Sequence, residues 1–173
     1  MHLKSKMEMN KNLKKYCKNI FDDNTIIIDV GSYNVCGTYR NTIPPRWEYK
    51  GVDIKDGPNV DILMDDPKKI PLDDSFADIV ISGQCIEHCK TPWILVREMS
   101  RILKKGGHCF ITAPATWWEH KFPVDCFRYY PDGMRSLMEE AGLTVLDAYV
   151  SPPNGITYGQ IDSQTDCWGI GQK

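Results

Sequence analysis

Acids and histidines follow several apolar stretches of this chain, at the points where strands are expected to end. Asp29 and Asp53 each close such a stretch, and His88 and His120 come after two others. A carboxylate can accept hydrogen bonds from both hydroxyls of a ribose, and a neutral imidazole is the side chain best suited to remove a proton near neutral pH. Ligands of open α/β sheets bind outside the carboxyl ends of the strands, so the pattern predicts a ligand site there.

The stretch Thr25–Gly37, TIIIDVGSYNVCG, is the first place to expect that ligand. Its β-branched run suits a strand buried on both faces, and Gly31 after it lets the backbone turn tightly and approach a ligand. The loop is not a dinucleotide fingerprint, because Tyr33 stands where the second glycine is needed, and it is not a P-loop. An ordinary strand-to-helix turn stays open on this stretch alone.

Composition limits the class of protein. The chain has 173 residues, 42% of them hydrophobic and 25% charged, which is enough for one domain with a substantial core. A net charge of −2 gives the whole protein no general attraction for polyanions. None of the seven cysteines forms a C-x-x-C pair, which favours reduced thiols and a cytoplasmic location. No stretch predicts a membrane span or a signal peptide.

Alternating strands and helices predict an α/β fold with a mostly parallel sheet. An amphipathic helix over 1–21 is expected to cover one edge of the sheet; its lysines leave a nucleic-acid-binding arm as a second interpretation. A further helix opens at Thr91-Pro92, with Thr91 as N-cap, and closes at Lys104–Gly107 with a left-handed cap. The remaining expected elements are strands at 26–28, 47–54, 60–64, 76–82, 108–114, 143–150 and 166–171, and a helix at 131–141.

Four ordered segments resemble the class I S-adenosylmethionine-dependent methyltransferases, of the type 11 kind. They are DVGS (29–32), GVDI (51–54), VDILMDD with IPLDDSFADIVIS (60–82), and EMSRILKKGGHCFITAP (98–114). The resemblance implies a Rossmann-like seven-stranded, mostly parallel sheet with an antiparallel last strand and helices on both faces. It also implies one methyltransferase domain over 1–173: the helix 1–21, a cofactor-binding core 22–114, and an acceptor side 115–173.

The resemblance also implies which residues hold S-adenosyl-L-methionine. Asp53 would hold the ribose, and Asp65 or Asp66, with Asp65 preferred, would meet the adenine amino group. The loop after the fourth strand would line the methionine end. The full set expected at the cofactor is Asp29, Gly31, Ser32, Asp53, Ile54, Asp65, Asp66, Ser82, Gly83 and Gln84.

A second resemblance concerns residues 117–134, WWEHKFPVDCFRYYPDGM. This stretch is similar to an H-x-x-P-x-D-x-x-R segment of sugar- and glycan-modifying methyltransferases, here His120, Pro123, Asp125 and Arg128. We expect His120 to act as base with Asp125 as a possible orienting partner. His88, in an E-H pair typical of the family, is the alternative base or a structural residue. A salt bridge between Asp125 and Arg128 that shapes the loop is a simpler interpretation of those two.

A metal-binding interpretation also exists. Some small-RNA 3′-end methyltransferases hold a divalent ion with E-x-x-E-H and a distant histidine; here those positions are Gln84, Glu87, His88 and His120. Amide, carboxylate and imidazole are acceptable ligands together. The first carboxylate of the motif is missing, so the sequence favours a site without metal and predicts that EDTA has little effect.

The expected function is O-methylation of a sugar or glycan hydroxyl by in-line transfer. Alternatives are an RNA ribose or a small metabolite as acceptor, with or without a metal, and a non-catalytic partner subunit that binds S-adenosylmethionine. The expected partner is therefore a small-molecule or glycan acceptor. Nucleic acid and membrane are not expected, and a homodimer stays open.

Overall fold

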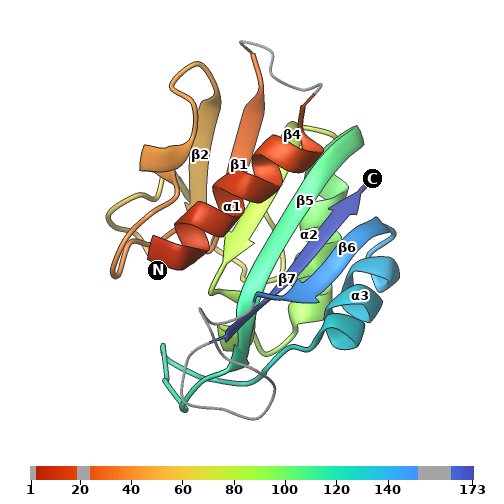
Figure 1. The fold of residues 1–173 in the computed structure, drawn as a ribbon. Helices are drawn as coiled ribbons and strands as arrows, with labels where there is room; N and C mark the ends of the chain where they lie inside the picture. Colours follow the sequence, from red (N-terminus) through yellow and green to blue (C-terminus); the bar gives the residue numbers. More distant parts are fainter. Residues whose placement is uncertain (1–2, 19–23, 152–164) are drawn as a thin grey trace.

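A seven-stranded sheet forms the centre of the part of the chain that the computed structural model describes, residues 3–18, 24–151 and 165–173 (Figure 1). Its order is β3-β2-β1-β4-β5-β7-β6. Neighbours from β3 to β5 are parallel, while β7 is antiparallel to both β5 and β6. The strands are β1 (Ile26–Val30), β2 (Glu48–Asp53), β3 (Ile62–Leu63), β4 (Ala77–Gly83), β5 (Leu103–Thr116), β6 (Thr144–Val150) and β7 (Thr165–Gln172). The predicted Rossmann-like sheet with an antiparallel last strand is confirmed.

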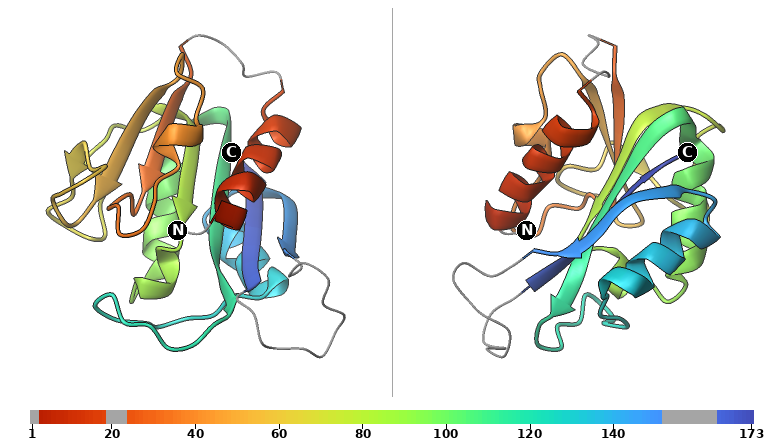
Figure 2. Two further views of the ribbon diagram at one scale, coloured as in Figure 1. Left: turned by 60° about the vertical axis from the view of Figure 1, so that its left-hand side comes forward. Right: turned by 45° about the vertical axis from the view of Figure 1, so that its right-hand side comes forward.

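Helices cover both faces of this sheet, as predicted (Figure 2). On one face lies α1, whose Met9 and Leu13 join a buried cluster with residues of β1, β4, β5 and β7. On the other face lie α2 and α3, which share the larger cluster. The helical elements are α1 (Leu3–Tyr16), η1 (Arg40–Thr42), η2 (Ile86–His88), α2 (Pro92–Ile102) and α3 (Pro131–Glu140). Because helices cover both faces, the central strands are buried on both sides, which explains the unbroken apolar runs in the sequence.

The first helix departs from its prediction in place and length. It covers a face of the sheet and not an edge, because its apolar side meets Ile27, Phe110 and Trp168 of three different strands. It ends at Tyr16, whereas the prediction continued to residue 21. Residues 19–21, which the prediction included, lie outside the described residues.

The predicted end of the second long helix is wrong. The helix stops at Ile102, and β5 begins at Leu103, which pairs with Ala77 of β4. The residues expected to cap the helix are already in the strand: Gly106 donates its N–H to the carbonyl of Lys173 at 2.8 Å. Lys104 binds the carboxylate of Asp78 at 2.8 and 2.9 Å. Pairing with distant parts of the chain therefore overrides the local capping signal.

Two smaller predictions also need correction. Thr91 occupies the N-cap position of α2 and Pro92 its first turn, but the Thr91 side chain makes no capping hydrogen bond. The third strand is limited to Ile62–Leu63, shorter than the predicted 60–64.

None of the seven cysteines is in a disulfide. Among the described helices, none combines the length and apolar character needed to cross a bilayer.

Candidate active site

The sheet changes direction of winding between β1 and β4. These strands are neighbours, while β2 and β3 continue on one side and β5 on the other. After β1 the chain continues to β2 on one side, and after β4 it continues to β5 on the other. Such a switch point is where open α/β sheets bind ligands. The segment after β5 passes along the same end of the molecule, at the bottom of Figure 1.

The loop after β1 packs directly against the loop after β4. Gly31 has φ +81°, and a Cβ placed on it would lie 2.3 Å from Sγ of Cys85. Glycine is required here by its conformation and by the Cys85 side chain that packs against it. Ser32 is buried and donates its hydroxyl to the carbonyl of Asn59 at 3.1 Å. The predicted cofactor loop thus has two of its members occupied by internal packing.

Asp29 is a buried carboxyl with a built-in partner. It is 2% exposed, and the hydroxyl of Tyr49 on β2 donates a hydrogen bond to it. That hydroxyl in turn accepts from the amide of Asn59 at 3.0 Å. Burial raises the pKa of Asp29 to about 7, with the Tyr49 hydrogen bond working in the opposite direction. Its side chain links β1 to β2 through the Tyr49 hydroxyl.

Asp53, at the end of β2, is the acid best placed for a cofactor. One carboxylate oxygen accepts the backbone N–H of Tyr33 at 2.9 Å and the other accepts that of Lys55 at 3.0 Å. Each oxygen keeps a lone pair for a further donor, and the side chain is fixed in position. Beside it, Ile54 is 57% exposed and offers an apolar surface. A fixed carboxylate with remaining acceptor capacity beside an apolar residue fits a nucleoside ribose and base.

The two acids after β3 lie at the surface. Asp66 accepts the backbone N–H of Lys68 at 2.8 Å, so its carboxylate stabilises a turn. Asp65 is exposed and adjoins Met64, whose N–H donates to the Asp53 carbonyl at 2.8 Å. The structure thus joins this segment to the end of β2.

The loop after β4 uses its polar side chains within the protein. Ser82 is fully buried and donates its hydroxyl to the carbonyl of Val30 at 2.8 Å. A Cβ on Gly83 would lie 2.3 Å from the hydroxyl of Tyr39. Gln84 has φ +56° and donates its amide to Asp166 at 3.1 Å. Ser82, Gly83 and Gln84 therefore shape the loop, and only their backbone is left to meet a ligand.

Glu87, His88 and His120 come together at this end of the sheet. Their nearest ligand-type atoms all lie within 4.8 Å of one another. The His88 and His120 rings meet edge to face, with centroids 4.9 Å apart. The side chains are exposed by 0% for Glu87, 16% for His88 and 37% for His120. The cluster therefore runs from a fully buried carboxyl to a histidine in contact with solvent.

Glu87 differs from Asp29 because it lacks a partner. Neither of its carboxyl oxygens has a hydrogen-bond partner among the described residues. Nε2 of His88 lies 3.7 Å from one of these oxygens, which is too long for a hydrogen bond. Burial raises the pKa of Glu87 to about 8, while its own backbone N–H offsets part of the effect. An unsatisfied buried carboxyl carries a large desolvation penalty, so it indicates a group that the folded protein holds for a ligand.

His88 and His120 are both oriented by a contact of their Nδ1 atom with a backbone carbonyl, which leaves Nε2 for other partners. Nδ1 of His88 lies 2.7 Å from the carbonyl of Val124, and Nδ1 of His120 lies 3.2 Å from that of Trp118. A carbonyl only accepts, so each Nδ1 carries a proton, and in the neutral ring Nε2 is then the nitrogen with the free lone pair. Burial lowers the pKa of His88, which favours its neutral form.

The expected salt bridge between Asp125 and Arg128 is present and shapes the loop around His120. The guanidinium binds both carboxylate oxygens, at 2.6 and 2.7 Å. Asp125 also accepts the backbone N–H of His120 at 2.7 Å, and its oxygen lies 3.5 Å from Nδ1. The Arg128 guanidinium holds the pKa of the Asp125 carboxyl below its usual range. Asp125 is thus placed to orient His120, not to touch a substrate.

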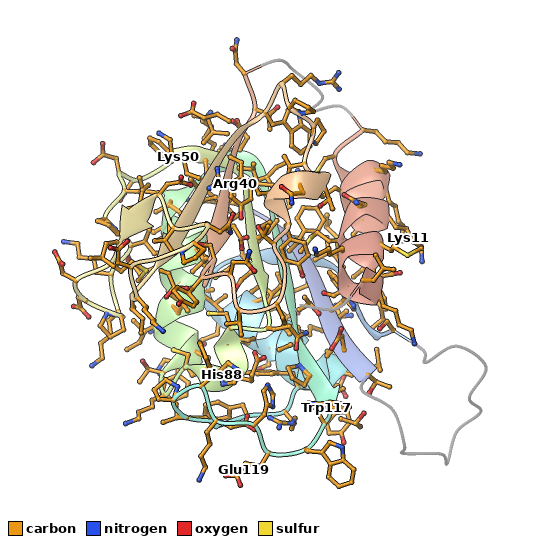
Figure 3. All side chains as sticks on the ribbon, turned by 90° about the vertical axis from the view of Figure 1, so that its left-hand side faces the viewer. Lys11, Arg40, Lys50, His88, Trp117 and Glu119 are labelled. Atoms are coloured by element: carbon orange, nitrogen blue, oxygen red, sulfur yellow. The ribbon has the colours of Figure 1, made fainter. Side chains whose placement is uncertain are left out.

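The aromatic segment after β5 extends to the cofactor side. Phe122 lies 6.5 Å from the Tyr33 ring and 6.3 Å from the His88 ring, centroid to centroid. Lys55 lies over the Tyr33 ring, 4.3 Å from its centroid. Figure 3 shows His88 at the same end of the molecule as Trp117 and Glu119 of this segment. Residues near Asp53 and residues near His120 therefore border one region.

Sequence reasoning missed the most unusual member of this site. The sequence names Glu87 in the E-H pair and as a position of the metal-binding motif, but it does not predict the complete burial of Glu87 without a hydrogen-bond partner among the described residues. The signal that could have identified it is the spacing of Glu87 and His88 after a buried strand. The hydrogen bond from the Cys126 N–H to the Glu87 carbonyl, 2.7 Å long, could not have been predicted from residue spacing.

Comparisons with known proteins agree with this geometry. Residues 36–111 match the family model described as a methyltransferase domain. A 2-methyl-6-phytyl-1,4-hydroquinone methyltransferase of spinach chloroplasts is 31% identical over 72 residues, 40% of this chain. That match spans about a fifth of the spinach protein, 21% of its length.

Two solved structures show the shared fold. A SAM-dependent methyltransferase from Aquifex aeolicus is 15% identical with a TM-score of 0.59, and the match covers 98% of each chain. The 1,6-didemethyltoxoflavin-N1-methyltransferase of Burkholderia thailandensis, solved with its substrate and S-adenosylhomocysteine, is 11% identical with a TM-score of 0.71. That match covers 97% of this chain and 77% of the other. The family model thus matches a methyltransferase domain over 36–111, and the solved structures show that the chain has the fold of such enzymes.

Proposed function

We propose that this chain is an S-adenosylmethionine-dependent methyltransferase that acts on a hydroxyl group. The observation that carries the proposal is the meeting of Glu87, His88 and His120 at the sheet's switch point, where a backbone carbonyl lies within hydrogen-bond reach of Nδ1 of each histidine. Asp53, fixed by two backbone N–H groups, would accept the ribose hydroxyls of the cofactor. When bound, the cofactor supplies an activated methyl group on a sulfonium.

The site residues would serve an in-line displacement. The acceptor oxygen forms a bond to the methyl carbon with its lone pair, the carbon–sulfur bond breaks, and its electron pair stays on sulfur. The hydroxyl proton passes to Nε2 of His120, whose Nδ1–H is held by the Trp118 carbonyl beside Asp125. A hydroxyl is a weak nucleophile until its proton leaves, so a base within hydrogen-bond reach accelerates the step.

The acceptor is proposed to be a sugar or glycan hydroxyl. Exposed rings around the site support this choice, since aromatic faces suit the apolar face of a sugar. Trp118 is 77% exposed, Tyr130 61% and Phe122 46%. In this proposal residues 22–114 hold the cofactor and 115–173 the acceptor, within one domain. An RNA ribose or a small phenol would offer the same hydroxyl chemistry and would be an outcome of the acceptor test.

The experiment has two stages. Calorimetric titration with S-adenosylmethionine should show binding in the wild type and much weaker binding in Asp53→Ala. A screen with radiolabelled methyl donor against oligosaccharides, RNA and phenols should then show transfer to a saccharide hydroxyl. No cofactor binding would contradict the proposal as a whole. Binding without transfer to any acceptor would instead indicate a non-catalytic partner subunit, and transfer to RNA or a phenol would reassign the acceptor.

A further inference from the structure

We propose that Glu87, His88 and His120 form a binding site for one divalent first-row transition-metal cation, for which Zn²⁺ is the test ion. The three side chains offer one carboxylate oxygen and two imidazole nitrogens, all within 4.8 Å of one another. This site replaces the metal-free site that the sequence favoured.

The orphaned carboxyl is the first observation behind this inference. Both Glu87 oxygens are buried and lack a hydrogen-bond partner among the described residues. The nearest cationic candidate, Nε2 of His88, lies 3.7 Å from one of them. Ligand atoms around a cation at about 2.0–2.2 Å lie roughly 3–4 Å apart, so this pair already has a suitable separation. A cation between them would satisfy the carboxylate that the protein leaves unpaired.

The orientation of the histidines is a second, independent observation. A metal-binding histidine typically donates its other ring N–H to a backbone carbonyl or a carboxylate, which fixes the tautomer and aims the lone pair. His88 does so to Val124 at 2.7 Å, and His120 to Trp118 at 3.2 Å, with Asp125 3.5 Å from the same nitrogen. Each histidine therefore already has the outer hydrogen bond that a metal ligand needs. Small side-chain rotations of His120, at the exposed edge, can bring the third ligand atom closer.

The donor set indicates the kind of ion. Two imidazoles and one carboxylate suit zinc, iron, cobalt and manganese, whereas magnesium and calcium prefer oxygen ligands alone. Three protein ligands leave an open position, as in catalytic zinc sites. The 37% exposure of the His120 side chain places that opening toward solvent. Resting on the proposed function, the acceptor oxygen would take this position. In the metal-loaded form Nε2 of His120 would be a ligand and not the base; the cation would lower the pKa of the hydroxyl, and its proton would pass to solvent, which the partly exposed His120 borders.

Metal binding can be tested without any assay of methyl transfer. Full-length protein stripped with EDTA and dialysed would be titrated with ZnCl₂ in a calorimeter under reducing conditions. We expect one equivalent to bind, with affinity lowered about 100-fold or more in Glu87→Gln and in His120→Gln. Glu119→Gln removes an exposed carboxylate of the same segment, which pairs with Lys121 at 3.3 Å, and should bind zinc as the wild type does.

A spectroscopic measurement keeps the test decisive if a variant folds poorly. Co²⁺ added to wild-type protein should give the visible bands of a nitrogen- and oxygen-ligated site. A thiolate-to-cobalt charge-transfer band would assign the ion to cysteines and overturn the proposal, as would the absence of stoichiometric binding or equal affinity in all variants. Because S-adenosylmethionine binding is measured separately, loss of cofactor binding with zinc binding intact would contradict the proposed function alone.

Discussion

Two buried carboxyl groups lie near the same end of this sheet, those of Asp29 and Glu87. They differ in whether another side chain donates a hydrogen bond to them. Asp29, on β1, receives a hydrogen bond from Tyr49, which is itself bonded to Asn59. Glu87, after β4, has no such partner among the described residues. Burial raises the pKa of both, to about 7 for Asp29 and to about 8 for Glu87.

The difference separates structural from functional acids at one sheet edge. A buried carboxyl with a built-in donor is stabilised by the fold and rigidifies it. A buried carboxyl without one weakens the fold unless a ligand completes it. We therefore assign Asp29 to the framework of the cofactor loop and Glu87 to the reacting centre, with His88 and His120 beside it.

The largest expected effect is at His120. His120→Ala should lower kcat by about 10²–10⁴, the usual contribution of a group that removes a proton, while the Kd for S-adenosylmethionine stays unchanged. Steady-state kinetics with the acceptor found in the screen, together with calorimetry, provide the two values. If His88→Ala loses turnover and His120→Ala keeps it, the role belongs to His88; full activity in both would leave positioning as the source of catalysis.

The second prediction tests Asp29 as a framework acid. Its folded pKa, about 7, lies above the unfolded value of about 3.9, so the folded state retains a proton that the unfolded state has lost. Stability should be complete below about pH 4 and decrease as the pH rises through 7, by about 3 kcal/mol between pH 5 and pH 8. Urea unfolding should show this loss in the wild type in addition to the loss caused by Glu87, whose pKa is also raised; Asp29→Asn should keep only the Glu87 part. An identical slope in both proteins would contradict the assignment.

The third prediction concerns Asp53, the half-buried acid at the end of β2. Asp53→Ala should lose roughly 2–3 kcal/mol of cofactor binding, because charge-assisted hydrogen bonds are the strong kind. Calorimetric titration gives the value. Asp66→Ala, which removes a turn-forming carboxylate from the neighbouring loop, is a suitable comparison and should have a smaller effect. Unchanged affinity in a folded Asp53→Ala protein would remove Asp53 from the cofactor site.

The smallest expected effect concerns the salt bridge between Asp125 and Arg128 in the segment after β5. Arg128→Lys keeps the charge but cannot bind both oxygens of Asp125 with one planar fork, so His120 would be held less firmly. We expect kcat to drop about tenfold, within the range seen for outer hydrogen-bond partners. Arg97→Lys, at the exposed pair with Glu140, should leave kcat as it is. Equal activity of both variants would show that the salt bridge serves stability only.

The sequence predicted much of the fold, because the apolar runs are unambiguous. The run 76–82 became β4, and the weak stretch 166–171 became the antiparallel strand β7. The helix cap at Lys104–Gly107 could not be predicted correctly, because its residues pair with β4 and with the C-terminal Lys173. Local signals carry no information about such distant partners.

The sequence predicted where the candidate site lies better than it predicted the roles of the residues in it. His88 and His120 meet as their strand ends suggested, and Asp53 is fixed for a ligand. The isolation of Glu87 depends on burial by the segment around Val124–Arg128, and the contact at Gly31 depends on Cys85. The isolation of Glu87 and the contact of Gly31 with Cys85 both result from packing between loops. Residue spacing in the sequence gives no information about such packing.

The most direct test of the account is a crystal structure of the full chain with S-adenosylhomocysteine. The account predicts ribose hydroxyls on the Asp53 carboxylate and the cofactor's sulfur facing Glu87, His88 and His120. Electron density that places the sulfur away from these three side chains, or the ribose on another acid, would contradict it.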